Sequence, residues 1–560
     1  MTALRTDPSP SQEVPPMTSR QTGGELLAAQ LVAEGVTTVF GVPGIQLDYA
    51  VDGIAQQGKG LDFVVARHEQ GAAYMADGYA RVAGKPGVCL VVPGPGLLNA
   101  GAALATAYAC SSPMVLIVGQ IPSPTIGRGY GMLHEIPEQS RLLRSLTKWH
   151  RLVTSPEDVP DAIAEAFQQV RSGRPRPVAV EVPPDVLKSL SDAELVPSRP
   201  VTPLAPDPED VRQVVRLIGE AKNPVLYAGG GVRDAPSSAA LQELAERLGA
   251  PVVMSRNGRG ALSDRHPLAM SRLTGGPLLD RADTVIAVGT RFMTQQGRPV
   301  VHGAGRHRLI GINADPADLG EPRQYDAVLT TDAHSALTAL LAALPTQARP
   351  APDLSDLRRR SEELLREIQP QVQWLEAIRA ALPDDGVLVD ELTQVGYPSR
   401  IAYPVYQPGT YVTPGYQGTL GYGFPTGLGV QAADPDRPVV AITGDGGFGW
   451  CLPELATAAR YELGLVTVVF VNGSFGNVER IQQDTFGRTL GVELHNPDFA
   501  GLASAYGVRH ELVKTPEDLT TVIRAARGTR RPLLVEVPVG DMPSPWDLIA
   551  EPSYGEEAAR

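Results

Sequence analysis

Two glycine-rich turns, each directly after an apolar run, carry the residues whose spacing could do chemistry. The first reads Gly444-Asp445-Gly446-Gly447, and the second begins 27 residues after Asp445 and reads Asn472-Gly473-Ser474-Phe475-Gly476. A carboxylate oxygen from Asp445, an amide oxygen from Asn472 and a backbone carbonyl, here that of Ser474, are ligands that Mg²⁺ takes together with phosphate oxygens. Glycines let the backbone approach phosphates, and the N-terminus of the following helix offers free N–H groups. The two turns therefore predict a site for Mg²⁺ and a diphosphate group.

The residues around these turns have the pattern of a βαβ unit. Residues 438–477 read as apolar strand, turn, helix, apolar strand and turn. Parallel strands would place both turns at one edge of a sheet. A Gly-Asp-Gly triplet alone is an ordinary turn, and the surrounding elements are what favour a ligand site. The segment resembles the thiamine-diphosphate motif of the acetohydroxyacid synthase, decarboxylase and carboligase superfamily, which implies cofactor contacts from Gly444, Gly446, Gly447, Phe475 and Gly476.

A second segment, residues 62–99, resembles the glutamate motif of the same superfamily. An apolar strand runs into Arg67-His68-Glu69-Gln70, a helix of small residues follows, and a second apolar strand ends in Gly94-Pro95-Gly96. The resemblance implies that Glu69 hydrogen-bonds N1′ of the aminopyrimidine and favours the tautomer that deprotonates the thiazolium carbon. It also places Gly44, Gly94 and Asn99 around this end of the cofactor. The alternative, a surface carboxylate paired with Arg67, is the default for a lone glutamate.

The order of strands and helices predicts an α/β fold with three doubly wound parallel-sheet domains. Residues 189–208 and 346–353 are rich in proline and polar residues and mark the linkers. We expect a disordered arm (1–19), a pyrimidine-binding domain (20–190), a central nucleotide-type domain (205–345), a domain binding diphosphate and Mg²⁺ (355–540) and a C-terminal lid or tail (541–560). The resemblance implies a homo-oligomer, a dimer or a dimer of dimers, in which Glu69 and Asp445 of one site belong to different chains.

Composition narrows the classes of partner. The 560 residues carry a formal net charge of −13 and no long basic run, which argues against nucleic acid. No apolar run reaches membrane length, and the N-terminal residues lack the apolar core of a signal peptide. The three cysteines lack metal-ligand spacing, so we expect buried thiols in a cytoplasmic enzyme with no membrane partner.

Further cofactor contacts are implied by the resemblance. Gly418 and Leu420 belong to the segment that supports the bent cofactor, although Leu420 could equally be a core residue. In the central domain, glycines and polar residues follow the predicted strands, where ligands bind in open α/β sheets. Relatives hold ADP or FAD here, and some hold nothing; we favour ADP over FAD, with contacts from Gly230, Gly231, Arg291, Asn313 and Asp332.

The reaction depends on the residues around the cofactor. Acetohydroxyacid synthases carry a methionine and a tryptophan that shape the acceptor pocket, where this chain has Asn477 and Ile481. The tail after residue 538 resembles that of oxalyl-CoA decarboxylases and 2-hydroxyacyl-CoA lyases. This branch implies cleavage of a 2-hydroxyacyl-CoA, for example 2-hydroxyisobutyryl-CoA, to formyl-CoA and a ketone or aldehyde. Tyr397 or Arg400 would then contact the CoA of the acyl-CoA substrate.

Glu493, on the loop that follows the diphosphate motif, is the candidate proton shuttle, and Glu391 and His134 compete for the same role. Each has an ordinary alternative as a solvated or structural group, and the sequence does not separate them. Two other functions stay open, an acetolactate-synthase-like carboligase and a 2-oxo acid decarboxylase. A third, an inactive cofactor-binding regulatory subunit, is disfavoured because Glu69, Asp445 and Asn472 are all present.

Overall fold

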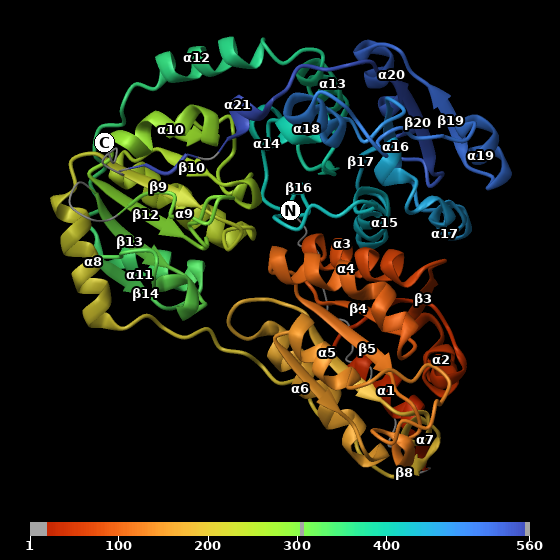
Figure 1. The fold of residues 1–560 in the computed structure, drawn as a ribbon. Coiled ribbons are helices and arrows are strands. Elements are labelled where there is room, and N and C mark those ends of the chain that lie inside the picture. Colours follow the sequence, from red (N-terminus) through yellow and green to blue (C-terminus); the bar gives the residue numbers. More distant parts are fainter. Residues whose placement is uncertain (1–19, 303–306, 551, 555–560) are drawn as a thin grey trace, which may run out of the picture.

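The computed structural model describes residues 20–302, 307–550 and 552–554, and within them the chain forms three six-stranded parallel sheets in three regions (Figure 1). The expected arm at residues 1–19 lies outside the described residues, as do residues 551 and 555–560 of the expected tail. The predicted fold class is confirmed. In the described part of the chain, every helix is too short or too polar to cross a membrane.

The first sheet is sandwiched between two layers of helices. Its strand order is β3 (Asp62–Val65), β2 (Thr38–Gly41), β4 (Gly87–Val91), β5 (Met114–Gly119), β7 (Val178–Val182) and β6 (Trp149–Leu152). Alternate residues of β4 face opposite cores, because side chains alternate along a strand. One face packs on α3 (Glu69–Val82) and α4 (Pro95–Cys110), and the other on α1 (Gly23–Ala33) and α6 (Val159–Arg171).

The third sheet shares a core with the first. Its order is β16 (Tyr411–Val412), β15 (Val387–Val389), β17 (Val439–Gly444), β18 (Val466–Val471), β20 (Leu533–Pro538) and β19 (Arg509–Leu512). Helix α15 (Gly423–Ala433) lies against α3 (Figure 1), and small residues allow this approach: a Cβ at Gly429 would overlap the carbonyl of Met75. The two domains therefore pack as one body at this helix pair.

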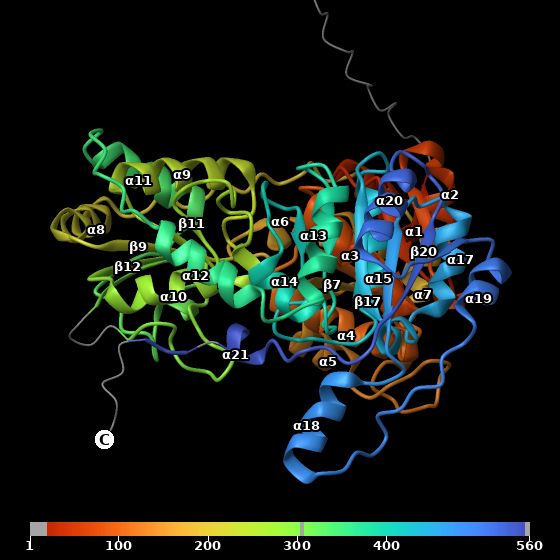
Figure 2. The ribbon, with the colours of Figure 1, turned by 90° about the horizontal axis from the view of Figure 1, so that it is seen from above.

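The central sheet has its own core and lies beside the other two (Figures 1 and 2). Its order is β11 (Ala269–Met270), β10 (Val252–Met254), β9 (Pro224–Ala228), β12 (Thr284–Val288), β13 (Arg308–Ile312) and β14 (Ala327–Leu329). Helices α8 (Pro208–Glu220), α9 (Ala235–Leu248), α10 (Arg272–Arg281) and α11 (Ala333–Ala343) accompany it.

All three sheets reverse their strand order at an interior position. The chain leaves β2, β9 and β15 in one direction and returns to the other side with β4, β12 and β17. Loops at the carboxyl ends of such neighbouring strands diverge and leave a crevice for ligands. The fold therefore offers a crevice in each domain, at β2/β4, β9/β12 and β15/β17.

Two segments extend from this framework. Helix α18 (Gly476–Phe486) projects from the body (Figure 2), and it contains no buried residue. After β20 the chain runs back toward the central domain through α21 (Trp546–Ile549), and Tyr554 forms a parallel bridge with Val301.

Candidate cofactor and active site

The two predicted metal turns meet at the carboxyl ends of β17 and β18. These strands are parallel and in register, with Gly444 beside Phe470. Asp445 is buried, and its Oδ2 accepts hydrogen bonds of 2.7 Å from Gly473 N and from Asn496 Nδ2. The first turn therefore holds the second turn directly, and it fixes Asn472 beside the Asp445 carboxylate.

The donor set of these turns fits Mg²⁺ bound with a diphosphate. The described residues contain no cluster of three or more histidine, cysteine or acidic side chains that could hold a metal alone. One carboxylate (Asp445), one amide oxygen (Asn472) and the carbonyl of Ser474 provide hard oxygen atoms, and Mg²⁺ takes its remaining ligands from phosphates and water. These three residues would hold the metal as the sequence predicts.

The glycines around the turns allow the two turns and Glu391 to pack closely together. A Cβ at Gly446 would lie 2.7 Å from the ring of Phe475, and one at Gly476 would lie 2.7 Å from Asn472 Nδ2. Gly447 packs on the carboxylate of Glu391. The predicted diphosphate contacts Gly444, Gly446, Gly447, Phe475 and Gly476 thus lie in one place.

Glu391 lies beneath these glycine-rich turns and is 1% exposed. Its carboxylate accepts hydrogen bonds from Gly421 N at 2.9 Å, Gly423 N at 3.1 Å and Thr443 Oγ1 at 2.6 Å. Burial raises the pKa of Glu391, against the lowering effect of these donors. This burial favours a positioning role for Glu391 over the proton-transfer role predicted from the sequence.

The pyrimidine half of the predicted site gathers at β2, β3 and β4 of the first domain. Glu69 begins α3, and its Oε2 accepts a hydrogen bond of 2.9 Å from Asn99 Nδ2 on α4. Gly94 caps α4 with a φ of 59°, a conformation that suits glycine. Gly44 follows β2 and contacts Val92. The structure therefore brings these four predicted residues to the switch point of the first sheet.

His134 lies beside this half of the site. Its carbonyl packs on Gly94, its φ is 67°, and its Nδ1 lies 3.1 Å from Gln46 Oε1. Gln46 Nε2 also donates to the carbonyl of Leu133. The histidine loop is therefore attached to the loop that follows Gly44.

The segment around Leu420 connects the first and third domains. Gly418 approaches Leu392, which follows β15, and the carbonyl of Leu420 accepts a hydrogen bond of 3.4 Å from Gln70 Nε2. The Leu420 side chain is 37% exposed, so it is not an ordinary core residue. It remains a candidate support for the cofactor rings.

A cavity of about 1400 Å³ opens between the three domains. All five residues predicted to bind a nucleotide line it: Gly230, Gly231, Arg291, Asn313 and Asp332. The Arg291 guanidinium lies 4.3 Å from the Tyr416 ring centroid, and Asn313 Nδ2 donates to the carbonyl of Thr290 at 2.9 Å. Gly418, Tyr397 and Arg400 line the same cavity, so the predicted nucleotide and CoA contacts share one space.

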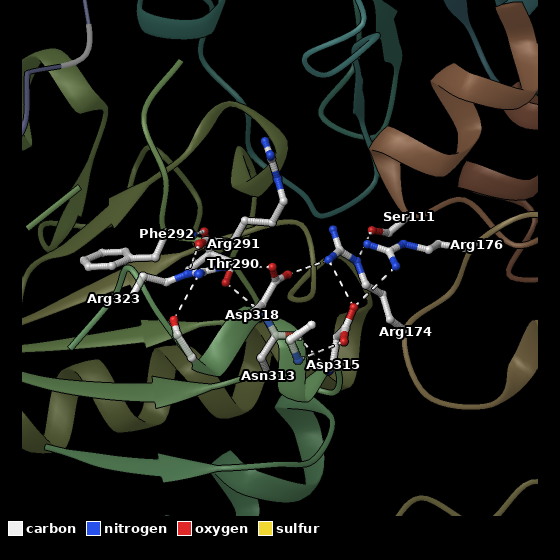
Figure 3. Close-up of polar contacts among 12 residues, drawn as sticks. Ser111, Arg174, Arg176, Thr290, Arg291, Phe292, Asn313, Asp315, Asp318 and Arg323 are labelled. Atoms are coloured by element: carbon white, nitrogen blue, oxygen red, sulfur yellow. Dashed lines mark hydrogen bonds and ion pairs between the residues drawn. The ribbon is translucent and has the colours of Figure 1, made fainter. Parts of the chain in front are cut away.

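One wall of the cavity is a charged seam between the first and central domains (Figure 3). Arg174 pairs with Asp318 and Asp315, and Arg176 pairs with Asp315 at 3.4 Å. On the central side, Arg323 pairs with Asp318 at 3.0 Å. These ion pairs join the segment before β7 of the first sheet to the loop after β13.

Comparison with known proteins decides the family. Residues 21–142 match the thiamine pyrophosphate enzyme N-terminal TPP binding domain, residues 211–340 the central domain and residues 394–537 the C-terminal TPP binding domain. The chain belongs to the thiamine pyrophosphate enzyme family. The matched first and third domains are those that carry Glu69 and the Asp445 turn, and thiamine pyrophosphate is the thiamine diphosphate predicted from the sequence.

Relatives within the thiamine pyrophosphate enzyme family include decarboxylases and synthases. The chain is 36% identical to the probable 2-ketoarginine decarboxylase AruI of Pseudomonas aeruginosa, over 92% of this chain and 94% of that protein. It is 32% identical to the acetolactate synthase large subunit of Corynebacterium glutamicum, over 96% of this chain and 90% of that protein. It is 31% identical to the acetolactate synthase isozyme 3 large subunit of Escherichia coli, over 90% and 92%.

Sequence reasoning missed two features of this thiamine pyrophosphate enzyme. Glu454 of the third domain accepts hydrogen bonds from the backbone directly before Glu69. Trp546 of the tail donates from Nε1 to Asn477 Oδ1 at 2.7 Å and lies beside Tyr397, with ring centroids 5.0 Å apart. Both are contacts between segments far apart in the chain, and local patterns carry no signal for them.

Proposed function

We propose that this enzyme is a lyase that decarboxylates a 2-oxo acid and does not join the product to a second oxo acid. The observation that carries the proposal is the hydrogen bond of 2.7 Å from Trp546 Nε1 to Asn477 Oδ1. The first turn of α18 is therefore occupied by a contact with the C-terminal tail. In acetohydroxyacid synthases, methionine and tryptophan at the positions of Asn477 and Ile481 shape the pocket of the acceptor acid.

The described residues support separate roles for the side chains that would surround the cofactor. When bound, thiamine diphosphate supplies the nucleophilic carbon and the electron sink for breaking a bond next to a carbonyl group. Asp445, Asn472 and the Ser474 carbonyl would hold Mg²⁺ and the diphosphate. Glu69 would share a proton with the aminopyrimidine, and Glu493 or His134 would deliver a proton to the product carbon.

We place each active site between two chains. Exposed apolar side chains surround both halves of the site. On the metal side they are Val478, Ile481, Phe486 and Leu490, and on the pyrimidine side Ile45, Leu98, Tyr130 and Leu133. Large apolar side chains left exposed beside a site are typical of an interface. A second copy of the chain would cover both sets at once, with Glu69 of one chain facing Asp445 of the other.

The central cavity supports a proposal for ADP, with FAD as the less favoured ligand. Arg233 and Arg291 line the cavity and provide positive charge for a diphosphate, whereas Arg174 and Arg256 of the same lining are paired with Asp318 and Asp390. The glycine loop at Gly230 and Gly231 follows β9 at the switch point of the central sheet, a position that suits phosphate groups.

A second candidate, cleavage of a 2-hydroxyacyl-CoA to formyl-CoA, is favoured by one observation. Tyr397, Arg400 and Trp546 line the large cavity together, and the paired rings offer a stacking surface for an adenine. A CoA moiety would then occupy the space assigned above to ADP. The two functions therefore make opposite predictions for competition between ADP and the substrate.

One experiment separates these functions. The purified holoenzyme is incubated with 2-oxo acids from pyruvate to 2-ketoarginine and with 2-hydroxyacyl-CoAs, and the products are identified by mass. A decarboxylase releases CO₂ and the aldehyde one carbon shorter. Formyl-CoA would establish the second candidate, and a 2-hydroxy-2-methyl-3-oxo acid from pyruvate would establish a carboligase.

A further inference from the structure

Strand β3, which leads to Glu69, is an edge strand of the first sheet in the described part of the chain. Its outer edge is bound by side chains of the third domain. The Tyr461 hydroxyl donates to the carbonyl of Phe63 at 3.1 Å and accepts from Val65 N at 2.8 Å. Thr457 Oγ1 lies 3.5 Å from the carbonyl of Val65. Side chains of α17 (Leu455–Arg460) and its flanks thus replace a missing neighbour strand.

The spacing of these side chains matches the strand. Thr457 lies within α17, and Glu454 and Tyr461 directly flank it; spaced three and four positions apart, the three side chains lie on one side of this segment. Four residues of helix rise about 6 Å, and two residues of strand rise about 6.6 Å. Successive side chains of the helix therefore reach successive outward-facing backbone groups of β3.

Glu454 is the third side chain of this row, and it contacts the backbone N–H groups of the two residues directly before Glu69. Its Oε1 accepts hydrogen bonds of 3.1 Å from Arg67 N and from His68 N. Thr457 Oγ1 donates to its Oε2 at 2.6 Å, and the residue is 1% exposed. Gly71, in the first turn of α3, packs on the same carboxylate. The backbone contacts of this carboxylate hold the residues that present Glu69, and the Thr457 hydroxyl holds the carboxylate itself in place.

We propose that Glu454 is a positioning residue for Glu69: it fixes the start of α3, and so the angle at which the Glu69 carboxylate meets the aminopyrimidine. This inference rests on the role proposed for Glu69. Glu454 lies in the segment that begins at the metal ligand Asp445. In a site built from two chains, the two ends of this segment serve different sites: Asp445 anchors the cofactor of its own chain, and Glu454 adjusts the glutamate that serves the partner.

The first test measures cofactor activation separately from binding. Glu454→Ala should slow the exchange of the thiazolium C2 proton for deuterium in the holoenzyme by about 10- to 100-fold, the effect of losing a charged hydrogen-bond acceptor. The content of thiamine diphosphate and Mg²⁺ should stay near wild type. Glu454→Gln should recover part of the rate, because an amide oxygen still accepts one N–H.

Tyr461→Phe is the matched control, since it loosens β3 without touching the Arg67 and His68 peptides. We expect it to lower the melting temperature and to leave the exchange rate within a few fold of wild type. Gly71→Ala approaches the same carboxylate from the first domain and should act like Glu454→Ala. Equal slowing by Tyr461→Phe, or slowing by Glu454→Ala only in proportion to lost cofactor, would overturn the proposal.

Mixed dimers show which of the two active sites a Glu454 substitution impairs. In a Glu454→Ala chain paired with an Asp445→Ala chain, one site keeps an intact cofactor anchor and a correctly positioned Glu69, so activity should return. Paired with Glu69→Gln, neither site is intact, and activity should stay low. The reverse pattern would place Glu454 on the metal side and refute the inference. Mixing Glu69→Gln with Asp445→Ala tests the two-chain site itself; if that control fails, the exchange rates alone decide the role of Glu454.

Discussion

Ser474 and Glu493 face each other across an antiparallel bridge beside the metal turns. Phe475 N donates to the carbonyl of Val492, and Leu494 N donates to the carbonyl of Gly473, each at 2.8 Å. The loop that follows α18 is thereby attached to the residue whose carbonyl is the predicted metal ligand. Glu493 is exposed beside this point, where a proton donor for the product would be needed.

Replacing Glu493 tests that role. Glu493→Gln should lower kcat by about 10²–10⁴-fold with little change in cofactor affinity, because an amide cannot transfer the proton. Glu511→Gln, an exposed carboxylate on β19 of the same domain, is the control and should retain full activity. If His134→Gln shows the loss and Glu493→Gln does not, the histidine carries the proton.

The contact between Asp445 and Asn496 allows a graded test of the metal site. Asn496→Ala removes a hydrogen bond to a ligand, a change that commonly costs about 10–100-fold in metal affinity. Asp445→Ala removes the charged ligand itself and should leave the purified protein without stoichiometric cofactor. Metal and thiamine diphosphate contents, measured after gel filtration, check both. Stoichiometric cofactor in Asp445→Ala would place the anchor elsewhere.

Glu69→Gln should keep the fold, Mg²⁺ and diphosphate but lose most activity, since the amide cannot drive the tautomer shift. Coexpression with Asp445→Ala should restore activity, because one of the two sites in a mixed dimer then has both groups intact. Activity of the mixed dimers, isolated with two affinity tags, is the measurement. Wild-type turnover by Glu69→Gln alone would contradict the role proposed for Glu69.

The strands that the sequence predicts are the buried ones. Apolar runs such as residues 466–471 mark strands covered on both faces. In the three six-stranded sheets, the strands without such runs are β6, β11, β14, β16 and β19, and each of them lies at a sheet edge. β11 and β16 are buried but have only two residues each, while β6 and β19 carry polar residues, because solvent covers part of these edge strands. Period and hydrophobicity therefore predict the sheet interiors and one edge strand, β3, and miss the other edges of the six-stranded sheets.

The candidate site was also predicted only in part: the residues in turns after strands were predicted, and those whose role depends on distant contacts were not. Turns after buried strands predicted Asp445, Asn472 and the cavity residue Arg291, because strand ends converge in a parallel sheet. Glu391 could not be judged from sequence, since its burial depends on the segment at 421–423 folding over it. Glu454 was beyond reach for a similar reason: its partners are backbone groups of a domain almost 400 residues earlier.

Lys148, whose side chain contacts the backbone of the seam residue Arg174, predicts a pH dependence of stability. Its Nζ donates to the carbonyls of Ser172 and Arg174, and burial, with Arg176 nearby, lowers its pKa to about 8. The unfolded chain therefore binds this proton more tightly, and the stability contributed by Lys148 should rise as pH increases from about 8 to about 10. Unfolding free energies of wild type and Lys148→Met, compared across that range, should diverge in favour of wild type. A constant difference would contradict the lowered pKa.

The Asn477–Trp546 contact leads to a test of decarboxylase against synthase. Asn477→Met with Ile481→Trp restores the side chains that shape the acceptor pocket in acetohydroxyacid synthases, and it releases the tail from α18. The double variant should therefore turn more of a cleaved 2-oxo acid into ligated product and less into aldehyde. The ratio of the two products, read by mass, is the measurement.

Trp546→Phe is the matched control, because it keeps a ring beside Tyr397 and removes only the N–H; it should loosen the tail without adding ligation. Ligated product from the wild type in excess of aldehyde would show that the tail leaves an acceptor site open, and the enzyme would then be a carboligase.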